Sequence, residues 1–288
     1  MTLTLEQERE MADAAGETHW RRVAPLELNE VSLNGSGATQ RTEQGTYEPA
    51  GGYFRKRILT GNRNRNEKPE EINLGQTIQI VFLRKRRKLV ERGGTDGKII
   101  RATNEHNHTK EAVTLYHTET QQSETGIATD LRAKYSGLRT VELIYALLIT
   151  DGEPELVRIP VKGSSLGSDA KAETTTDLYK YMASFDSKEH IWQFYTNLSA
   201  VFEQGKMAYF AIDFKRGEAI DKTFLFDVVR PALLRVRDNC TAVDQSRQEK
   251  IAAGVSVAVP STDAQEMWDK GSNEEIPTDD DILNSIPF

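Results

Sequence analysis

A strand pattern and a cationic run adjoin each other in the segment Thr77-Ile78-Gln79-Ile80-Val81-Phe82-Leu83-Arg84-Lys85-Arg86-Arg87-Lys88. Its first seven residues are largely β-branched or aromatic, which predicts a β-strand. Gly93–Gly97 predicts a turn, and Lys98–Arg101 predicts the strand that pairs back. We therefore expect a hairpin that carries dense positive charge next to the ring of Phe82.

Further strands are expected on both sides of this hairpin. Gly51–Leu59 has a strand pattern that begins with two glycines. Val141–Ile149 is apolar on both alternating faces, as in a central buried strand. Leu156–Lys162 alternates and predicts a second hairpin with the strand before it, in which Arg158 and Lys162 share the wet face.

The C-terminal half adds helices to the strands. Thr176–Phe185 and Phe224–Asn239 have apolar residues at helical spacing, and Lys206–Lys215 predicts a strand. Lys188–Phe202 fits an amphipathic helix, although its aromatic residues leave a strand open. From about Ala253 onward the sequence follows neither period, which predicts a linker.

Charge is distributed unevenly along the 288 residues, whose net charge is −7. Residues 55–92 hold 12 Lys or Arg against 4 Asp or Glu, a local charge of +8 (12 − 4). Residues 263–288 hold 8 acids against 1 Lys, a local charge of −7 (1 − 8). A basic zone combined with an acidic tail suggests interaction with nucleic acid. The alternative is a solvated charged face with a solubilising tail.

The remaining composition indicates the compartment. Cys240 is the one cysteine of the sequence, so no disulfide framework can form within the chain, which suits a reducing cytoplasm. The first residues lack the basic and apolar regions of a signal peptide. No apolar run approaches the roughly 20 residues of a membrane span. We expect a cytoplasmic protein, at the nucleoid or in a phage-infected cell, with no membrane partner.

The last ten residues carry a specific motif. Asp279-Asp280-Asp281 is followed by Ile282-Leu283-Asn284-Ser285 and by Ile286-Pro287-Phe288. This end resembles the C-terminal tip of bacterial single-stranded DNA-binding proteins, in which a run of aspartates leads into Ile-Pro-Phe. The four intervening residues depart from that pattern. In that family the tip recruits replication and repair proteins, and the resemblance implies this role for Asp279, Asp280, Asp281, Ile286, Pro287 and Phe288.

The strand pattern and the resemblance together indicate the fold class. We expect a mainly β protein with added helices: an oligonucleotide-binding (OB) fold-like barrel followed by a disordered acidic C-terminal tail. The expected parts are a flexible N-terminal arm at 1–44, an OB-like nucleic-acid-binding domain with helical additions at 45–252, a disordered linker at 253–278 and the interaction tip at 279–288.

Nucleic-acid contacts are expected where cations lie beside aromatic rings, because phosphates bind Lys and Arg while bases stack on rings. Adjacent strand residues face opposite ways, so one core should bury at most one of Tyr53 and Phe54. The candidate binding residues are Tyr53, Phe54, Arg55, Lys56, Arg57, Arg63, Arg65, Phe82, Arg84, Lys85, Arg86, Arg87, Lys88 and Lys162.

The favoured function is sequence-tolerant binding and protection of single-stranded DNA in replication, recombination or repair, without catalysis or a cofactor. One alternative is a metal-dependent nucleic-acid enzyme that uses His106, His108 and His117, although the chain has neither CxxC nor HExxH spacing. A second alternative is an adaptor that binds RNA or protein through its basic zone. The sequence does not determine the oligomeric state, and a homo-oligomer is compatible with it.

Overall fold

The computed structural model describes residues 25–41, 45–59, 69–93, 98–166, 175–204 and 208–252. The expected linker at 253–278 and tip at 279–288, and the candidates Arg63 and Arg65, lie outside these residues. The described part is mainly β, with one large mixed sheet, a two-stranded hairpin and a few helices. Among its helices, none is both long and apolar enough to cross a membrane.

The large sheet is built around β6 (Thr77–Gly93), a strand of 17 residues. One edge of β6 pairs with β10 (Arg139–Ile149) over nearly its whole length. The other edge pairs first with β12 (Phe194–Gln204) and, near its end, with β7 (Lys98–Thr103). On this edge β6 therefore belongs to two parts of the sheet: one continues through β12 and the other continues through β7.

The remaining strands extend the sheet from these neighbours. β10 is followed across the sheet by β11 (Glu155–Lys162), β1 (Asn29–Asn34), β4 (Tyr53–Arg57) and β5 (Glu71–Gly75). β7 is followed by β8 (Ala112–His117) and β9 (Ser123–Ile127), and β12 pairs with β13 (Ala208–Ala219). The pair of β1 and β11 is parallel, and β2 (Thr39–Arg41) and β3 (Tyr47–Pro49) form the separate hairpin.

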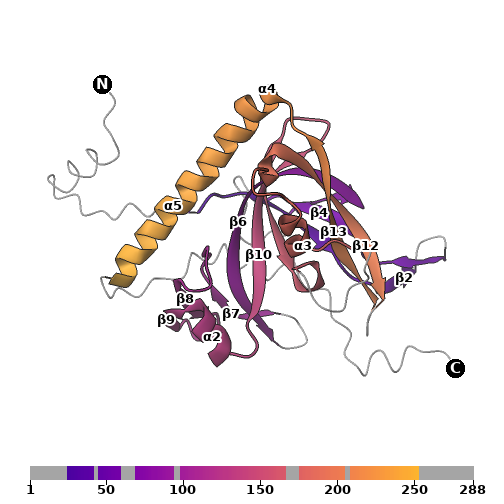
Figure 1. The fold of residues 1–288 in the computed structure, drawn as a ribbon. Coiled ribbons are helices and arrows are strands. Elements are labelled where there is room, and N and C mark those ends of the chain that lie inside the picture. The colour runs from indigo at the N-terminus through magenta and orange to yellow at the C-terminus, as the bar shows by residue number, and fades with distance from the viewer. Residues whose placement is uncertain are drawn as a thin grey trace.

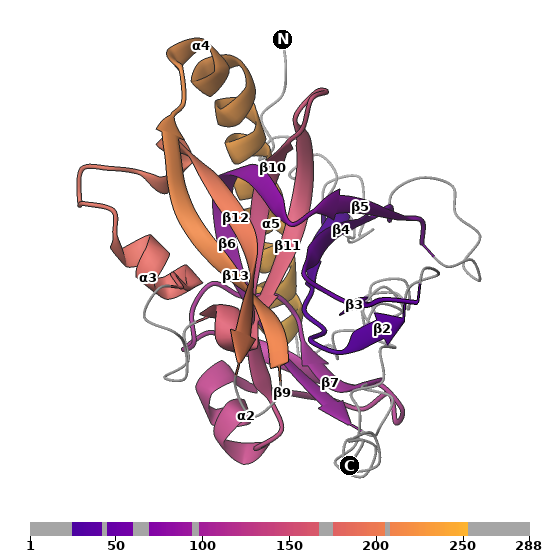
Figure 2. The ribbon, with the colours of Figure 1, turned by 90° about the vertical axis from the view of Figure 1, so that its right-hand side faces the viewer.

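The helices cover the sheet and its margins. α5 (Arg230–Ala252) lies along one face of β6 and β10, after α4 (Lys222–Phe224) and a π-helical turn at Leu225–Val229 (Figure 1). α2 (Ala128–Lys134) packs beside β8 and β9, whereas α3 (Leu178–Ala183) lies on the other side of the molecule from β4 and β5 (Figure 2).

Two cores lie on opposite faces of β10. Ile144 and Leu148 pack with residues of α3, β12 and β13, such as Tyr181, in the larger core. Tyr145 and Leu147 point the other way and pack against α5. This alternation is the period of two that strands impose. We call these two sides of the central strands the α3 face and the α5 face.

The expected hairpins are confirmed, but the expected closed barrel is wrong. β6 pairs with β7, and β10 pairs with β11, as the sequence predicted. The strands nevertheless form an open mixed sheet, because β6 diverges into two halves instead of leading round to a closing strand. An isolated bridge between Ser36 and Tyr209 connects the region after β1 to β13 without extending into a ladder.

Three segments differ from their expected states. The N-terminal segment at 1–44 was expected to be a flexible arm, but its part Asn29–Asn34 is β1, held between β4 and β11. The ambiguous segment Lys188–Phe202 contributes strand β12, because its aromatic residues pack on both sides of a ladder rather than along one helical stripe. The polar residues 102–136, whose sequence pattern predicts neither a helix nor a strand, supply β8, β9 and α2.

Gly52 provides a test of how tightly β4 approaches β13. Its φ is 91°, and an added Cβ would lie 2.7 Å from the ring of Phe210. Gly52→Ala should lower the free energy of unfolding by at least about 1–2 kcal/mol, because a left-handed backbone is costly for a residue with a Cβ. Urea unfolding measures the change.

Gly152→Ala is the matched control for this substitution. Gly152 is exposed, and its added Cβ would meet nothing closer than 3.9 Å. The control should change stability by no more than about 0.5 kcal/mol. Equal stability of the two variants would contradict the close approach of Gly52 to Phe210.

Candidate nucleic-acid interface

The cationic run of β6 is divided between the two faces of the sheet. Arg84 pairs across the strands with Tyr145, on the α5 face, whereas Lys85 pairs with Ile144, on the α3 face. Because successive strand side chains point in opposite directions, Arg86 and Lys88 lie on the α5 face with Arg84. Arg87 lies on the α3 face with Lys85. The expected single basic zone is therefore two separate groups of cations.

Cations from several strands meet on the α5 face. Val141 of β10 pairs with both Lys88 of β6 and Lys162 of β11, so these two lysines flank it in one cross-strand row. A second row runs through Arg84, Tyr145, Arg158, Glu30 and Arg57. We define the basic face as the six cations of this surface: Arg55, Arg57, Lys88, Arg92, Arg158 and Lys162.

The pKa values of the two lysines reflect this crowding. Burial and the nearby Arg158 lower the pKa of Lys88 to about 8. Burial of the ammonium group and the neighbouring Arg92 also lower the pKa of Lys162, whose side chain as a whole is exposed. Like charges held together disfavour the protonated form. An anion that enters this surface would relieve the repulsion.

Three carboxylates, of which Glu30 is buried, pair with the deeper cations of the basic face. The two oxygens of Glu30 lie 3.8 Å from Arg57 and 3.7 Å from Arg158, on the two neighbouring strands. Glu105 also binds Arg158, at 3.2 Å, and Glu71 accepts a hydrogen bond from Arg57 at 2.9 Å. Burial alone would lower the pKa of Arg158, but Glu105 and Glu30 raise it above its usual range. These ion pairs hold Arg57 and Arg158 below the other cations of the basic face, with side chains that are 3 % and 12 % exposed.

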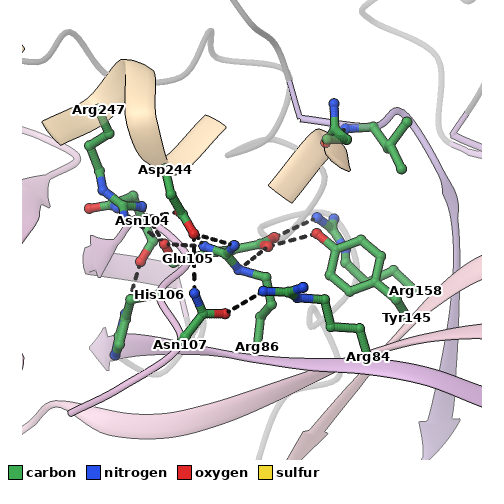
Figure 3. A network of polar contacts seen from close by, with 12 residues as sticks. Arg84, Arg86, Asn104, Glu105, His106, Asn107, Tyr145, Arg158, Asp244 and Arg247 are labelled. Carbon is green, nitrogen blue, oxygen red and sulfur yellow. Dashed lines mark hydrogen bonds and ion pairs between the residues drawn. The ribbon is translucent and has the colours of Figure 1, made fainter. Parts of the chain in front are cut away.

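Arg86 has a structural position beneath α5 rather than a place on the open surface. Its guanidinium donates two hydrogen bonds to Asp244 of α5, at 2.8 and 2.7 Å, and one to the backbone carbonyl of Glu105 at 2.9 Å (Figure 3). Only 2 % of the residue is exposed. Burial opposes the charge, but the bonds to Asp244 and the nearby Glu105 raise the pKa of Arg86.

The network around Arg86 continues through the loop after β7. Arg84 donates to Asn107, and Asn107 donates to Asp244, both at 3.2 Å (Figure 3). Arg247, one helical turn after Asp244, lies 3.0 Å from the same carboxylate. Polar groups from β6, the loop and α5 thereby contact one another. This network fastens the C-terminal half of α5 to the sheet.

The aromatic candidates have different exposures. Phe54 and Phe82 are core residues, 0 % and 2 % exposed, and rings enclosed in this way cannot stack on a base. Tyr53 is half-buried and lies on the same side of β4 as Arg55. This is the division expected from strand alternation. Lys56 points to the opposite side and bonds Glu155 at 2.7 Å.

The three histidines do not assemble a metal site. His106 is buried with its Nδ1 3.2 Å from the carbonyl of Asn104, and burial lowers its pKa. His108 is exposed, and His117 lies on β8 opposite Arg101. Within the residues that the structure describes, no group of three or more His, Cys, Asp or Glu side chains has the geometry to hold a metal ion.

Two members of the basic face were absent from the predicted binding residues. Arg158 had been assigned to the same wet face as Lys162 from alternation, which was the available signal for it. Arg92 joins the surface because Lys88, Val90 and Arg92 occupy alternate positions of β6. No protein-family model matches the chain, and neither its sequence nor its fold has a match among the curated proteins and solved structures searched.

Asp244 tests the attachment of α5. Asp244→Ala would remove the carboxylate that accepts two hydrogen bonds from the buried guanidinium of Arg86, and only the more distant carboxylate of Glu105, at 3.6 Å, would remain. Loss of one member of a buried ion pair costs about 3 kcal/mol. We expect the free energy of unfolding in urea to fall by about this amount.

Asp238→Ala on the same helix is the control. Asp238 pairs with Arg237 at the surface, where both side chains are more than half exposed. A pair of this kind contributes less than about 1 kcal/mol. The proposed attachment fails if both variants are equally stable.

Proposed function

We propose that the protein binds single-stranded DNA with little sequence preference through the basic face, and that it protects the strand during replication, recombination or repair. The proposal rests on the cross-strand row of Lys88 and Lys162, whose pKa values are lowered by burial and by neighbouring cations. A nucleic-acid backbone would neutralise these charges and release its counterions.

The chemistry of the surface supports a sequence-tolerant mode of binding. Its cations come from β4, β6 and β11, so a bound strand would cross several strands of the sheet. Lys and Arg that meet phosphates carry no base specificity by themselves. This surface would accordingly hold the backbone of any sequence.

Tyr53 supplies a ring at the margin of the basic face. It precedes Arg55 by two residues on β4, and Asn34 donates a hydrogen bond to its hydroxyl at 3.1 Å. A ring stacks on any base and contributes about 1–3 kcal/mol per base. Unpaired bases offer their faces for such stacking, whereas a duplex stacks them internally. This ring favours a single strand as the ligand.

The segment 279–288 forms the second part of the proposal. Phe288 would fill an apolar pocket of a replication or repair protein, while Asp279–Asp281 meet a basic rim around that pocket. The proposed division of labour is that the basic face holds DNA and the terminal peptide recruits partners.

Substitution of the central lysines tests the DNA-binding proposal. Lys88→Gln with Lys162→Gln should weaken binding of labelled oligo-dT in fluorescence anisotropy. The slope of log K against log salt is negative, and each lost phosphate contact reduces its magnitude by about 0.7. The slope of the double variant should therefore be smaller in magnitude by about 1.4. Duplex DNA and RNA of equal length should compete less well than unlabelled oligo-dT.

Lys188→Gln with Lys222→Gln removes the same charge from exposed positions outside the basic face. This control should retain the wild-type slope and affinity. An unchanged slope in the Lys88/Lys162 variant would refute the assignment of the site. Stronger competition by duplex or by RNA would instead refute the preference for single-stranded DNA.

The pKa of Lys88 predicts a pH dependence of binding. With a pKa of about 8 in the free protein, Lys88 loses its charge as the pH rises through that value. A phosphate beside it would raise this pKa, so binding would take up a proton above pH 8. Affinity for oligo-dT should fall about five- to tenfold from pH 7 to pH 9.

Lys88→Arg provides the matched control for the pH series. Arginine keeps its charge over the whole range, so this variant should bind oligo-dT with a much flatter pH profile. The charged groups that act on Lys88 are Arg158, Glu105, Glu30 and Arg92, and Lys162 lies in the same cross-strand row. Identical profiles for wild type and Lys88→Arg would exclude Lys88 as the titrating contact.

A further inference from the structure

The edge of β6 that pairs with β12 and β7 has a stretch between these two strands where no β-ladder forms. β12 pairs with residues 77–81 and β7 pairs with residues 90–93. Between these pairings the edge is met by the loop after β7, through an isolated bridge of Arg87 and His106 with backbone hydrogen bonds of 2.8 and 2.9 Å. We call this stretch of β6, which lacks ladder pairing on this edge, together with the loop that meets it, the notch.

An open pocket of 610 Å³ occupies the notch. Its walls are Lys85 and Arg87 of β6 and residues 107–111 of the loop. This volume lies within the range of about 300–1,000 Å³ that small-molecule sites have. The pocket is separate from the basic face, because Lys85 and Arg87 point to the α3 face while Lys88 points to the α5 face.

The lining of the pocket is cationic. Lys85, Arg87 and Lys110 contribute three positive charges, against one negative charge from Glu111. The carboxylate of Glu111 already accepts the backbone N–H groups of Asn107 and His108, at 3.2 and 3.1 Å. The same carboxylate also lies 3.8 Å from Arg247 of α5, so Glu111 already has partners in its own loop and on the helix. The excess positive charge selects for an anion.

A buried carboxylate positions the two strand cations. Glu142 is fully buried on β10, and it accepts hydrogen bonds from Arg87 and, at 2.7 Å, from the hydroxyl of Tyr179 on α3. Lys85 lies 3.5 Å from the same carboxylate. One negative charge thus orients two positive ones, which leaves a net charge of +1 in this group. The side chains are held in place before a ligand arrives.

An exposed aromatic ring lies next to these cations. Tyr179 is 39 % exposed, and the ammonium group of Lys85 is 5.5 Å from the centre of its ring. The bond from its hydroxyl to Glu142 restrains the ring at the surface. A planar base can stack on such a ring while a phosphate lies between the cations.

We propose that the notch is a nucleotide-phosphate site, distinct from the basic face. The phosphate binds between Lys85, Arg87 and Lys110, and the base stacks on Tyr179. The proposal goes beyond DNA binding by the basic face, and either one can fail without the other because their cations belong to opposite faces of β6.

Isothermal titration with thymidine 5′-monophosphate, thymidine and inorganic phosphate tests the site. The monophosphate should bind wild-type protein at least tenfold more tightly than thymidine, because the cations recognise the phosphate. Lys85→Gln with Lys110→Gln should weaken monophosphate binding at least tenfold. Lys88→Gln with Lys162→Gln, and the control Lys188→Gln with Lys222→Gln, should retain it.

Tyr179→Leu separates the phosphate from the base. This variant should bind the monophosphate several-fold more weakly while its weaker binding of inorganic phosphate stays unchanged. A folding defect would weaken both ligands together and would also lower the urea midpoint, which identifies it. Thymidylyl-thymidine, which carries one diester phosphate, distinguishes the sources of the ligand: binding assigns the site to a nucleic-acid backbone, and no binding assigns it to free nucleotides.

Three results would overturn the proposal. One is equal affinity for thymidine and its monophosphate, which would remove the phosphate as the determinant. Another is wild-type affinity in the Lys85/Lys110 variant with an unchanged urea midpoint. The third is loss of monophosphate binding in the Lys88/Lys162 variant, which would assign the phosphate to the basic face.

Discussion

The alternation of side chains along β6 is the constraint on which the other features depend. Seventeen residues of one strand pair with β10 on one edge and with both β12 and β7 on the other. A strand with a period of two must send neighbouring cations to opposite faces. The run Arg84–Lys88 therefore supplies one group of charges to the α5 face and another to the notch on the α3 face.

Carboxylates that are buried or half-buried make this concentration of positive charge compatible with a folded sheet. Asp244 binds Arg86 beneath α5, Glu30 lies between Arg57 and Arg158, and Glu142 orients Arg87. Each carboxylate lies beside a guanidinium group that would be costly to bury alone. Burial lowers the pKa of Lys88 and of Lys162, and the neighbouring Arg158 and Arg92 lower these pKa values further.

The sequence predicted local structure better than its assembly. Alternation and turn residues identified both hairpins, and the helical spacing of Thr176–Phe185 and Phe224–Asn239 identified α3 and α5. The closed barrel was wrong because ring closure depends on how strands far apart in the chain meet. Strand β1 was missed because Asn29–Asn34 is short and polar, and its place is secured by neighbours from β4 and β11.

The sequence by itself determined that the chain is rich in strands, that positive charge is concentrated in residues 55–92, and that one of Tyr53 and Phe54 must face away from a single core. Only the tertiary structure decided which cations are buried and which acids they pair with. Arg86 and its partner Asp244 are 158 positions apart, and Lys88 meets Lys162 through an intervening strand. The physical reason is that burial and ion pairing depend on distances in space, which local sequence patterns do not encode.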